Sequence, residues 1–287
     1  MKGLLSNPVL MKELKLRFRT FKSFSGLMFY LAVLIIFVSG FLLIFTQFST
    51  SGFFVPSNSF TMFSVLSVLQ MALVMFITPG LTAGAISTER EKQTLNILLT
   101  TTQSSSQIII GKLLSSVAFL ILMLIAGLPL YSIVFLFGGV SPGQFFTMFF
   151  FYLVTLIAIG SIGIMFSTIT KRTIISMIAT YGAMIFLGGI TAFFFFVGFS
   201  LEQMMMSQQQ NTQGLTTFLP ISYFWASINP GVLILTLLIP DTKTALIDTV
   251  GISFPNWIVY LIFYVFITIV CLTIAIRKLR ANMKTNR

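Results

Sequence analysis

The chain has 287 residues, of which 56% are hydrophobic and 8% are charged, and its net charge is +11. A soluble domain carries about 25% charged residues, so this composition excludes an ordinary soluble protein. The chain has no histidine and one cysteine, Cys271, which excludes an internal disulfide and leaves metal and proton-relay sites without their usual ligands. We therefore expect no metal site and interpret Cys271 as a small apolar filler.

Six apolar segments without charged residues dominate the chain, and they cover residues 26–46, 60–81, 115–137, 146–167, 174–196 and 257–276. A helix of about 20 residues crosses a hydrocarbon core of about 30 Å. The sequence therefore predicts an all-α membrane protein with six transmembrane helices, folded as a single transmembrane domain over residues 1–287.

Sixteen of the 17 Lys and Arg residues lie on one side of these six spans, and only Lys243 lies on the other side. Positive residues stay in the cytoplasm, so both termini are expected to be cytoplasmic. Basic residues at that boundary suit anionic lipid headgroups, and their scatter along the boundary offers no groove for nucleic acid. We expect a multi-pass protein of a plasma membrane, of bacterial type, that binds membrane lipids and no nucleic acid.

The first element in chain order is an expected amphipathic helix over residues 7–22. Leu14 lies on its apolar stripe, Lys12 lies on the opposite basic face, and Arg17 lies at the apolar edge. This pattern predicts a helix in the inner membrane interface, with Lys12, Glu13, Leu14 and Arg17 as its candidate functional residues. The alternative is a simple positively charged anchor before the first span.

A short helix is expected after the second span, over residues 88–100. Thr88 and Glu91 have the spacing of a capping box, which predicts that the helix begins at Thr88. An apolar face then carries Leu95 and the two leucines that follow. Such a helix suits docking of a cytoplasmic protein, or is an interfacial connector, and physics alone leaves both open. The candidate residues are Thr88, Glu89, Arg90, Glu91, Lys92, Leu95, Leu98 and Leu99.

Prolines and a long outer loop mark the rest of the chain. Pro79 and Pro129 interrupt spans two and three and are expected to kink them. The loop over residues 197–256 holds an apolar run at 232–239 between Pro230 and Pro240. Eight residues are too few to cross a bilayer, so the run predicts a re-entrant or interfacial element. It is either part of an outer gate or a packing plug.

The loop after span two resembles a known family signature. Residues 89–92 alternate acidic and basic, Thr94-Leu95 and Leu98-Leu99 follow, and Gly111-Lys112 leads into span three. This order is similar to that of type-2 ABC transporter permeases, and residues 7–14 are similar to the family's N-terminal interfacial helix. One departure is Thr102-Gln103-Ser104, where the family often has a proline, so the turn there is expected to differ.

The resemblance implies a permease that pairs with a second copy or a paralogous permease. Each permease then binds a cytoplasmic ABC ATPase subunit, two per complex, through the helix after span two. Spans one, two and five would face the partner permease and the transport path. The chain lacks a phosphate-binding loop, because Gly111-Lys112-Leu113 has neither the first glycine nor the hydroxyl. The chain is thus expected not to be an enzyme and to bind no cofactor, with ATP and Mg²⁺ held by the ATPase.

The residues of the spans also bear on two other classes of function. A secondary transporter or channel usually places charged residues at the midplane, and an intramembrane enzyme needs catalytic groups there, but these spans hold none. An uncharged path favours a hydrophobic or amphipathic substrate. Gln70 and Tyr181 are the candidate polar residues of that path, although a buried hydrogen bond is the alternative role for Gln70.

Overall fold

The computed structural model describes residues 11, 13, 21–48, 56–95, 104–136, 138, 140–209, 221–239 and 254–284. Most of the expected interfacial helix at 7–22, including Lys12, Leu14 and Arg17, lies outside the described residues. Leu98 and Leu99 lie outside them as well. Within the described ranges all regular structure is helical, which confirms the predicted fold class.

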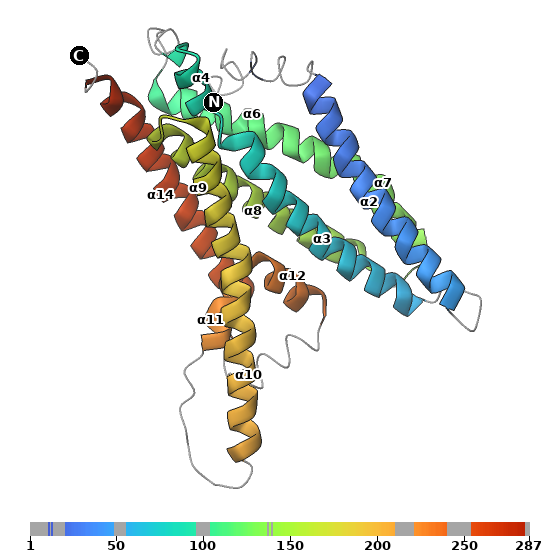
Figure 1. The fold of residues 1–287 in the computed structure, drawn as a ribbon. Coiled ribbons are helices and arrows are strands. Elements are labelled where there is room, and N and C mark those ends of the chain that lie inside the picture. Colours follow the sequence, from blue (N-terminus) through green and yellow to red (C-terminus); the bar gives the residue numbers. More distant parts are fainter. Residues whose placement is uncertain are drawn as a thin grey trace.

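Six helices are long and apolar enough to cross a membrane, as predicted (Figure 1). Spans one and two are α2 (Phe21–Phe48) and α3 (Pro56–Thr82). Span three comprises α6 (Ser105–Ala126) and α7 (Leu128–Leu136), and span four is α8 (Pro142–Ile169). Span five runs through α9 (Thr173–Ile185), η1 (Phe186–Ile190) and α10 (Thr191–Gln209), and span six is α14 (Asn256–Lys284).

The helices extend beyond the expected spans, and two boundaries differ most. Span three begins at Ser105 instead of residue 115, because the side chain of Ser104 caps it and Gln107 completes a capping box. Lys112 therefore lies inside the helix. Span five continues to Gln209, so the first part of the expected outer loop is helical. Apolar composition marks the part of a helix in lipid, whereas the helix itself continues past that boundary.

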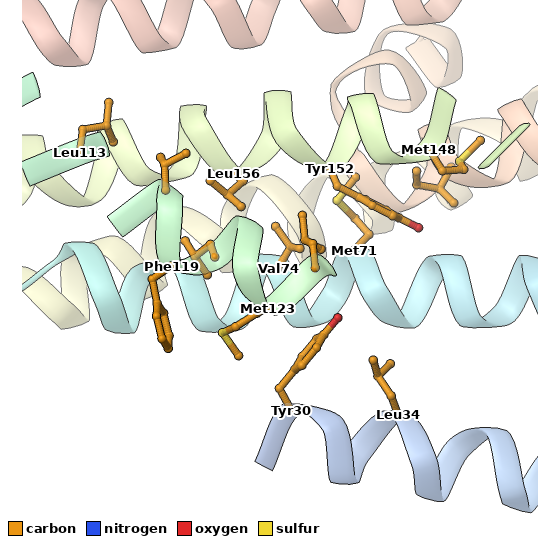
Figure 2. Close-up of a cluster of buried hydrophobic side chains, with 14 of the residues drawn as sticks. Tyr30, Leu34, Met71, Val74, Leu113, Phe119, Met123, Met148, Tyr152 and Leu156 are labelled. Carbon is orange, nitrogen blue, oxygen red and sulfur yellow. The ribbon is translucent and has the colours of Figure 1, made fainter. Parts of the chain in front are cut away.

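The centre of the bundle is α8, which packs against α3, α6, α9 and α14. Close approach of α3 is possible because α8 has glycine at the contact: a Cβ at Gly163 would lie 2.1 Å from Thr82 Oγ1. Figure 2 shows the apolar cluster that fills the space between α2, α3, α6 and α8, with side chains such as Leu34, Met71 and Leu156. In contrast, α2 lies at the edge and packs only on α3, α6 and α7 among the contacts that join described elements.

One of the two predicted kink positions coincides with a break in a helix, and span five carries a further irregularity. Span three breaks at Gly127, two residues before Pro129, and Pro79 lies inside α3. The further irregularity is η1, a five-residue π-helix in span five. Its Gly188 carbonyl accepts a hydrogen bond from Asn229 Nδ2 at 2.7 Å. Asn229 thus satisfies a carbonyl of the irregular turn from a distant part of the chain.

The apolar run at 232–239, predicted to be a re-entrant or interfacial element, lies almost entirely in a short helix. It is α12 (Pro230–Leu238), preceded by α11 (Ile221–Ile228), and the Asn229 side chain caps it by accepting from Val232 N at 2.9 Å. Six of its nine residues are buried, among them Leu233 and Ile234. This burial supports a packing role, and an additional role in gating stays a prediction.

Candidate functional site

The short helix after span two, α4 (Ser87–Glu91), differs in two ways from the expected helix at 88–100. It begins one residue earlier, and the predicted capping box is wrong, because no side chain caps its first turn. Glu91 instead accepts from Thr173 N at 2.7 Å and Thr173 Oγ1 at 2.8 Å. The Glu91 carboxylate therefore binds the unpaired N–H at the start of α9 and not the N–H groups at the start of α4, the helix to which Glu91 belongs.

The same helix ends at Glu91 instead of continuing to residue 100. Gln93 N donates to Arg90 O at 3.1 Å, and Thr94 N donates to Glu89 O at 2.9 Å. With Gln93 in the left-handed region at φ 58°, this is the Schellman motif that terminates helices. Glycine usually occupies that position, so a glutamine there gave no sequence signal. Leu95 is helical again after the turn.

Polar contacts fasten α4 to the junction of α8 and α9. Ser167 Oγ accepts from Ile86 N at 2.8 Å and Ser87 N at 2.9 Å. Arg90 donates to Thr170 O at 2.6 Å and Thr168 O at 3.0 Å. These are backbone groups at a helix end, which need partners from elsewhere in the fold. These hydrogen bonds therefore fix the position of α4 at both of its ends.

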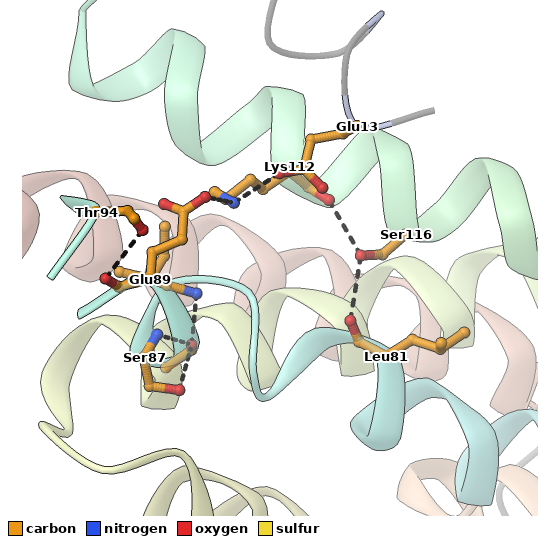
Figure 3. Close-up of polar contacts among 9 residues, drawn as sticks. Glu13, Leu81, Ser87, Glu89, Thr94, Lys112 and Ser116 are labelled. Atoms are coloured by element: carbon orange, nitrogen blue, oxygen red, sulfur yellow. Dashed lines mark hydrogen bonds and ion pairs between the residues drawn. The ribbon is translucent and has the colours of Figure 1, made fainter. Parts of the chain in front are cut away.

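A buried ion pair network joins α4 to span three (Figure 3). Lys112 Nζ lies 2.7 Å from Glu89 Oε1 and 2.9 Å from Glu13 Oε1, and the Lys112 side chain is 4% exposed. Sequence reasoning placed Glu13 and Glu89 in the candidate site but left Lys112 out of it. The available signal was a lysine in the second turn of an apolar helix, which needs a partner.

Only part of the described segment at residues 87–95 is exposed. Glu91, Lys92, Gln93 and Thr94 are exposed, whereas Thr88, Glu89 and Arg90 are half-buried. Leu95 is 8% exposed and belongs to the apolar core of the protein. Leu95 therefore packs inside this chain, and an apolar docking face stays a prediction. Among the described residues of this loop, the exposed surface is the tip formed by residues 91–94, which we call the α4 tip.

The two candidate polar path residues have different positions. Gln70 is 1% exposed, and its Oε1 accepts from the Tyr30 hydroxyl at 2.9 Å. This is the interhelical hydrogen bond considered as its alternative role. Tyr181 is partly exposed, and its hydroxyl donates to Phe76 O at 3.2 Å, three residues before Pro79. It joins α9 to the part of α3 just before Pro79, where proline removes a helical hydrogen bond.

The polar groups of this site are engaged in contacts within the chain. Among them no group of three His, Cys, Asp or Glu residues could hold a metal. The carboxylates of Glu13, Glu89 and Glu91 are occupied by Lys112 and Thr173. What the arrangement provides is an exposed tip on a short helix that is firmly fixed to three spans.

Six apolar helices, with α4 at one end of the bundle, define a multi-pass membrane protein. The family model described as ABC-2 family transporter protein matches residues 26–280, so the chain belongs to the ABC-2 transporter family. The resemblance seen in the sequence is thus confirmed: the chain is a membrane permease component of an ABC transporter, and its family is one of transport components, not of catalytic enzymes. A search among curated proteins gave no match to the chain.

Proposed function

We propose that this chain is the permease subunit of an ATP-driven exporter in a bacterial plasma membrane. Two copies, or this chain and a paralogous permease, pair and bind two ATPase subunits, which hold ATP and Mg²⁺. Closure of the ATPases moves the permeases by alternating access and carries the substrate outward. The observation that supports this most is the α4 tip, exposed at residues 91–94 on a helix bonded to α6, α8 and α9.

The polar contacts of α4 explain how force at the α4 tip would reach the spans. Arg90 and Glu91 bind the α8–α9 junction, and Glu89 binds Lys112 of α6. A displacement of α4 therefore acts on three spans through short polar bonds and not through a flexible loop. Packed elements of this kind shift as rigid bodies between discrete arrangements.

The substrate is proposed to be hydrophobic or amphipathic. The described part of α2 and the α9–α10 helix leaves large apolar side chains exposed, among them Ile36, Ile178 and Phe193. These surfaces suit lipid, the partner permease and an apolar substrate. A charged substrate would need charged partners, since an unpaired charge at the membrane centre costs several kcal/mol.

The docking proposal is tested by reversing the charge of Lys92. The protein is purified from its native membranes in mild detergent, and the co-purified ATPase is quantified by mass spectrometry. Lys92→Glu is expected to reduce ATPase recovery roughly tenfold, because a reversed charge at a complementary interface repels the partner. The matched control is Lys278→Glu, which reverses an exposed charge near the end of α14.

Full recovery of the ATPase with Lys278→Glu and strongly reduced recovery with Lys92→Glu would support docking at the α4 tip. Equal recovery with both variants would place the docking surface elsewhere. If the unmodified protein brings no ATPase and shows no ATP hydrolysis, the exporter function itself is wrong.

A further inference from the structure

Lys112 is a buried charge in a helix that is otherwise apolar. It lies in the second turn of α6, and only 4% of its side chain is exposed. A lysine in such surroundings retains its charge only when anionic partners replace water. The described structure gives it two, Glu13 at 2.9 Å and Glu89 at 2.7 Å.

The two carboxylates come from separate segments of the chain. Glu13 precedes span one and is followed by α2, whereas Glu89 lies in α4, after span two. Lys112 lies near the start of span three, so its ammonium group is the point at which three segments meet (Figure 3). The Lys112 carbonyl also accepts from Ser116 Oγ at 3.1 Å, and the same hydroxyl lies 3.5 Å from Leu81 O of α3.

The contact between the segment of Glu13 and α4 depends on the positive charge of Lys112. One ammonium group stands between two carboxylates, and Glu89 Oε2 is buried without a hydrogen-bond partner. Two carboxylates this close repel one another unless a cation lies between them. Removing the positive charge therefore both breaks the two bonds and creates a repulsion between the segment of Glu13 and α4.

We propose that Lys112 is a positioning residue that locks the segment of Glu13, α4 and α6 into one body. A displacement of the α4 tip is then transferred to the segment before span one as well as to span three. The lock is a property of this chain alone; its use in coupling ATP hydrolysis to transport rests on the proposed function.

The lock is tested by measuring the distance between its two outer segments. Spin labels are attached at Met11→Cys and Lys92→Cys, both exposed positions, in a Cys271→Ala background, and distances are measured by pulsed electron resonance in lipid nanodiscs. Lys112→Met keeps the length of the side chain but removes its charge. Lys112→Arg keeps the charge, and Lys171→Met removes an exposed charge outside the lock.

We expect a narrow distance distribution for the parent protein, for Lys112→Arg and for Lys171→Met. Lys112→Met is expected to give a distribution that is broader and shifted to longer distances. A narrow distribution in Lys112→Arg would show that the broadening in Lys112→Met comes from the lost charge and not from a general loss of packing. An unchanged distribution in Lys112→Met, or equal broadening in Lys171→Met, would overturn the lock.

A second measurement tests its use in the transporter. The affinity of the co-purified ATPase for the Lys112→Met permease is expected to fall roughly tenfold and to be restored in Lys112→Arg, a size typical of coupling between sites. If the parent protein binds no ATPase, the proposed function fails, while the distance measurement still decides the lock. If the ATPase binds Lys112→Met with unchanged affinity, the lock has no part in docking.

Discussion

At the scale of single residues, Ser167 decides where α4 begins. Its hydroxyl oxygen accepts two backbone N–H groups, from Ile86 and Ser87, and its proton is directed to Ser87 Oγ at 3.2 Å. Ser167 is fully buried, so no water can replace it. One side chain of α8 thereby performs the capping that the sequence of α4 lacks.

We expect Ser167→Ala to lower the free energy of unfolding by about 2 kcal/mol, because two buried amides lose their acceptor. The measurement is chemical or thermal unfolding of the protein in detergent. Ser39→Ala is the control, since the exposed Ser39 hydroxyl only bonds a carbonyl of its own helix. A loss in Ser167→Ala no larger than in Ser39→Ala would contradict the capping role.

At the scale of elements, the contact between α3 and α8 depends on missing side chains. A Cβ at Gly163 would lie 2.1 Å from Thr82 Oγ1 and 3.3 Å from the backbone nitrogen of Ala83. A Cβ at Gly160 would lie 3.6 Å from Thr82 Cγ2 of α3, and 3.1 Å from a methyl group of Leu113 on the neighbouring α6. Small residues let helices approach closely in membranes, where packing and not the hydrophobic effect joins them. This contact lies directly before α4 in the chain and so fixes the position of the residues that lead into α4.

Gly163→Ala is expected to cost about 1–3 kcal/mol, because the new methyl group forces α3 and α8 apart. Gly182→Ala in α9 is the matched control: no atom lies within 4 Å of a Cβ there, and alanine favours a helix over glycine. Thermal unfolding of both variants in the same detergent checks this. Equal stability of the two variants would show that the contact is looser than described.

At the scale of the whole molecule, the charges and the fold agree on an orientation. The described basic residues lie at the end of the bundle that carries α4 and the end of α14, whereas α10, α11 and α12 lie toward the opposite end (Figure 1). Those whose side-chain exposure is described are Arg90, Lys92, Lys112, Lys171, Arg172, Arg277 and Lys278. Because positive residues stay in the cytoplasm, the α4 end is expected to be cytoplasmic.

Single cysteines introduced into a Cys271→Ala background test this orientation. In intact cells a membrane-impermeant maleimide is expected to label Ser200→Cys, on exposed α10, and not Lys92→Cys or Lys278→Cys. Permeabilised cells should give labelling at all three positions, which controls for reactivity. Labelling of Lys92→Cys in intact cells would reverse the assigned topology.

Composition and the apolar spans by themselves predicted a helical protein that crosses a membrane six times, and the motif order in residues 89–112 indicated a resemblance to the ABC permeases. Lipid imposes about 20 apolar residues on each span, and such a signal can be read locally. Local patterns also located the short helix after span two and the one between Pro230 and Pro240.

Only the tertiary structure decided how these parts are joined. Glu91 caps α9 and not its own helix, Leu95 packs inside the protein, and Lys112 joins Glu13 to Glu89 across 99 and 23 residues of sequence. Each choice depends on a partner that is distant in the sequence. A buried polar group pairs with whichever suitable group the fold brings within reach, and local sequence does not record which one that is.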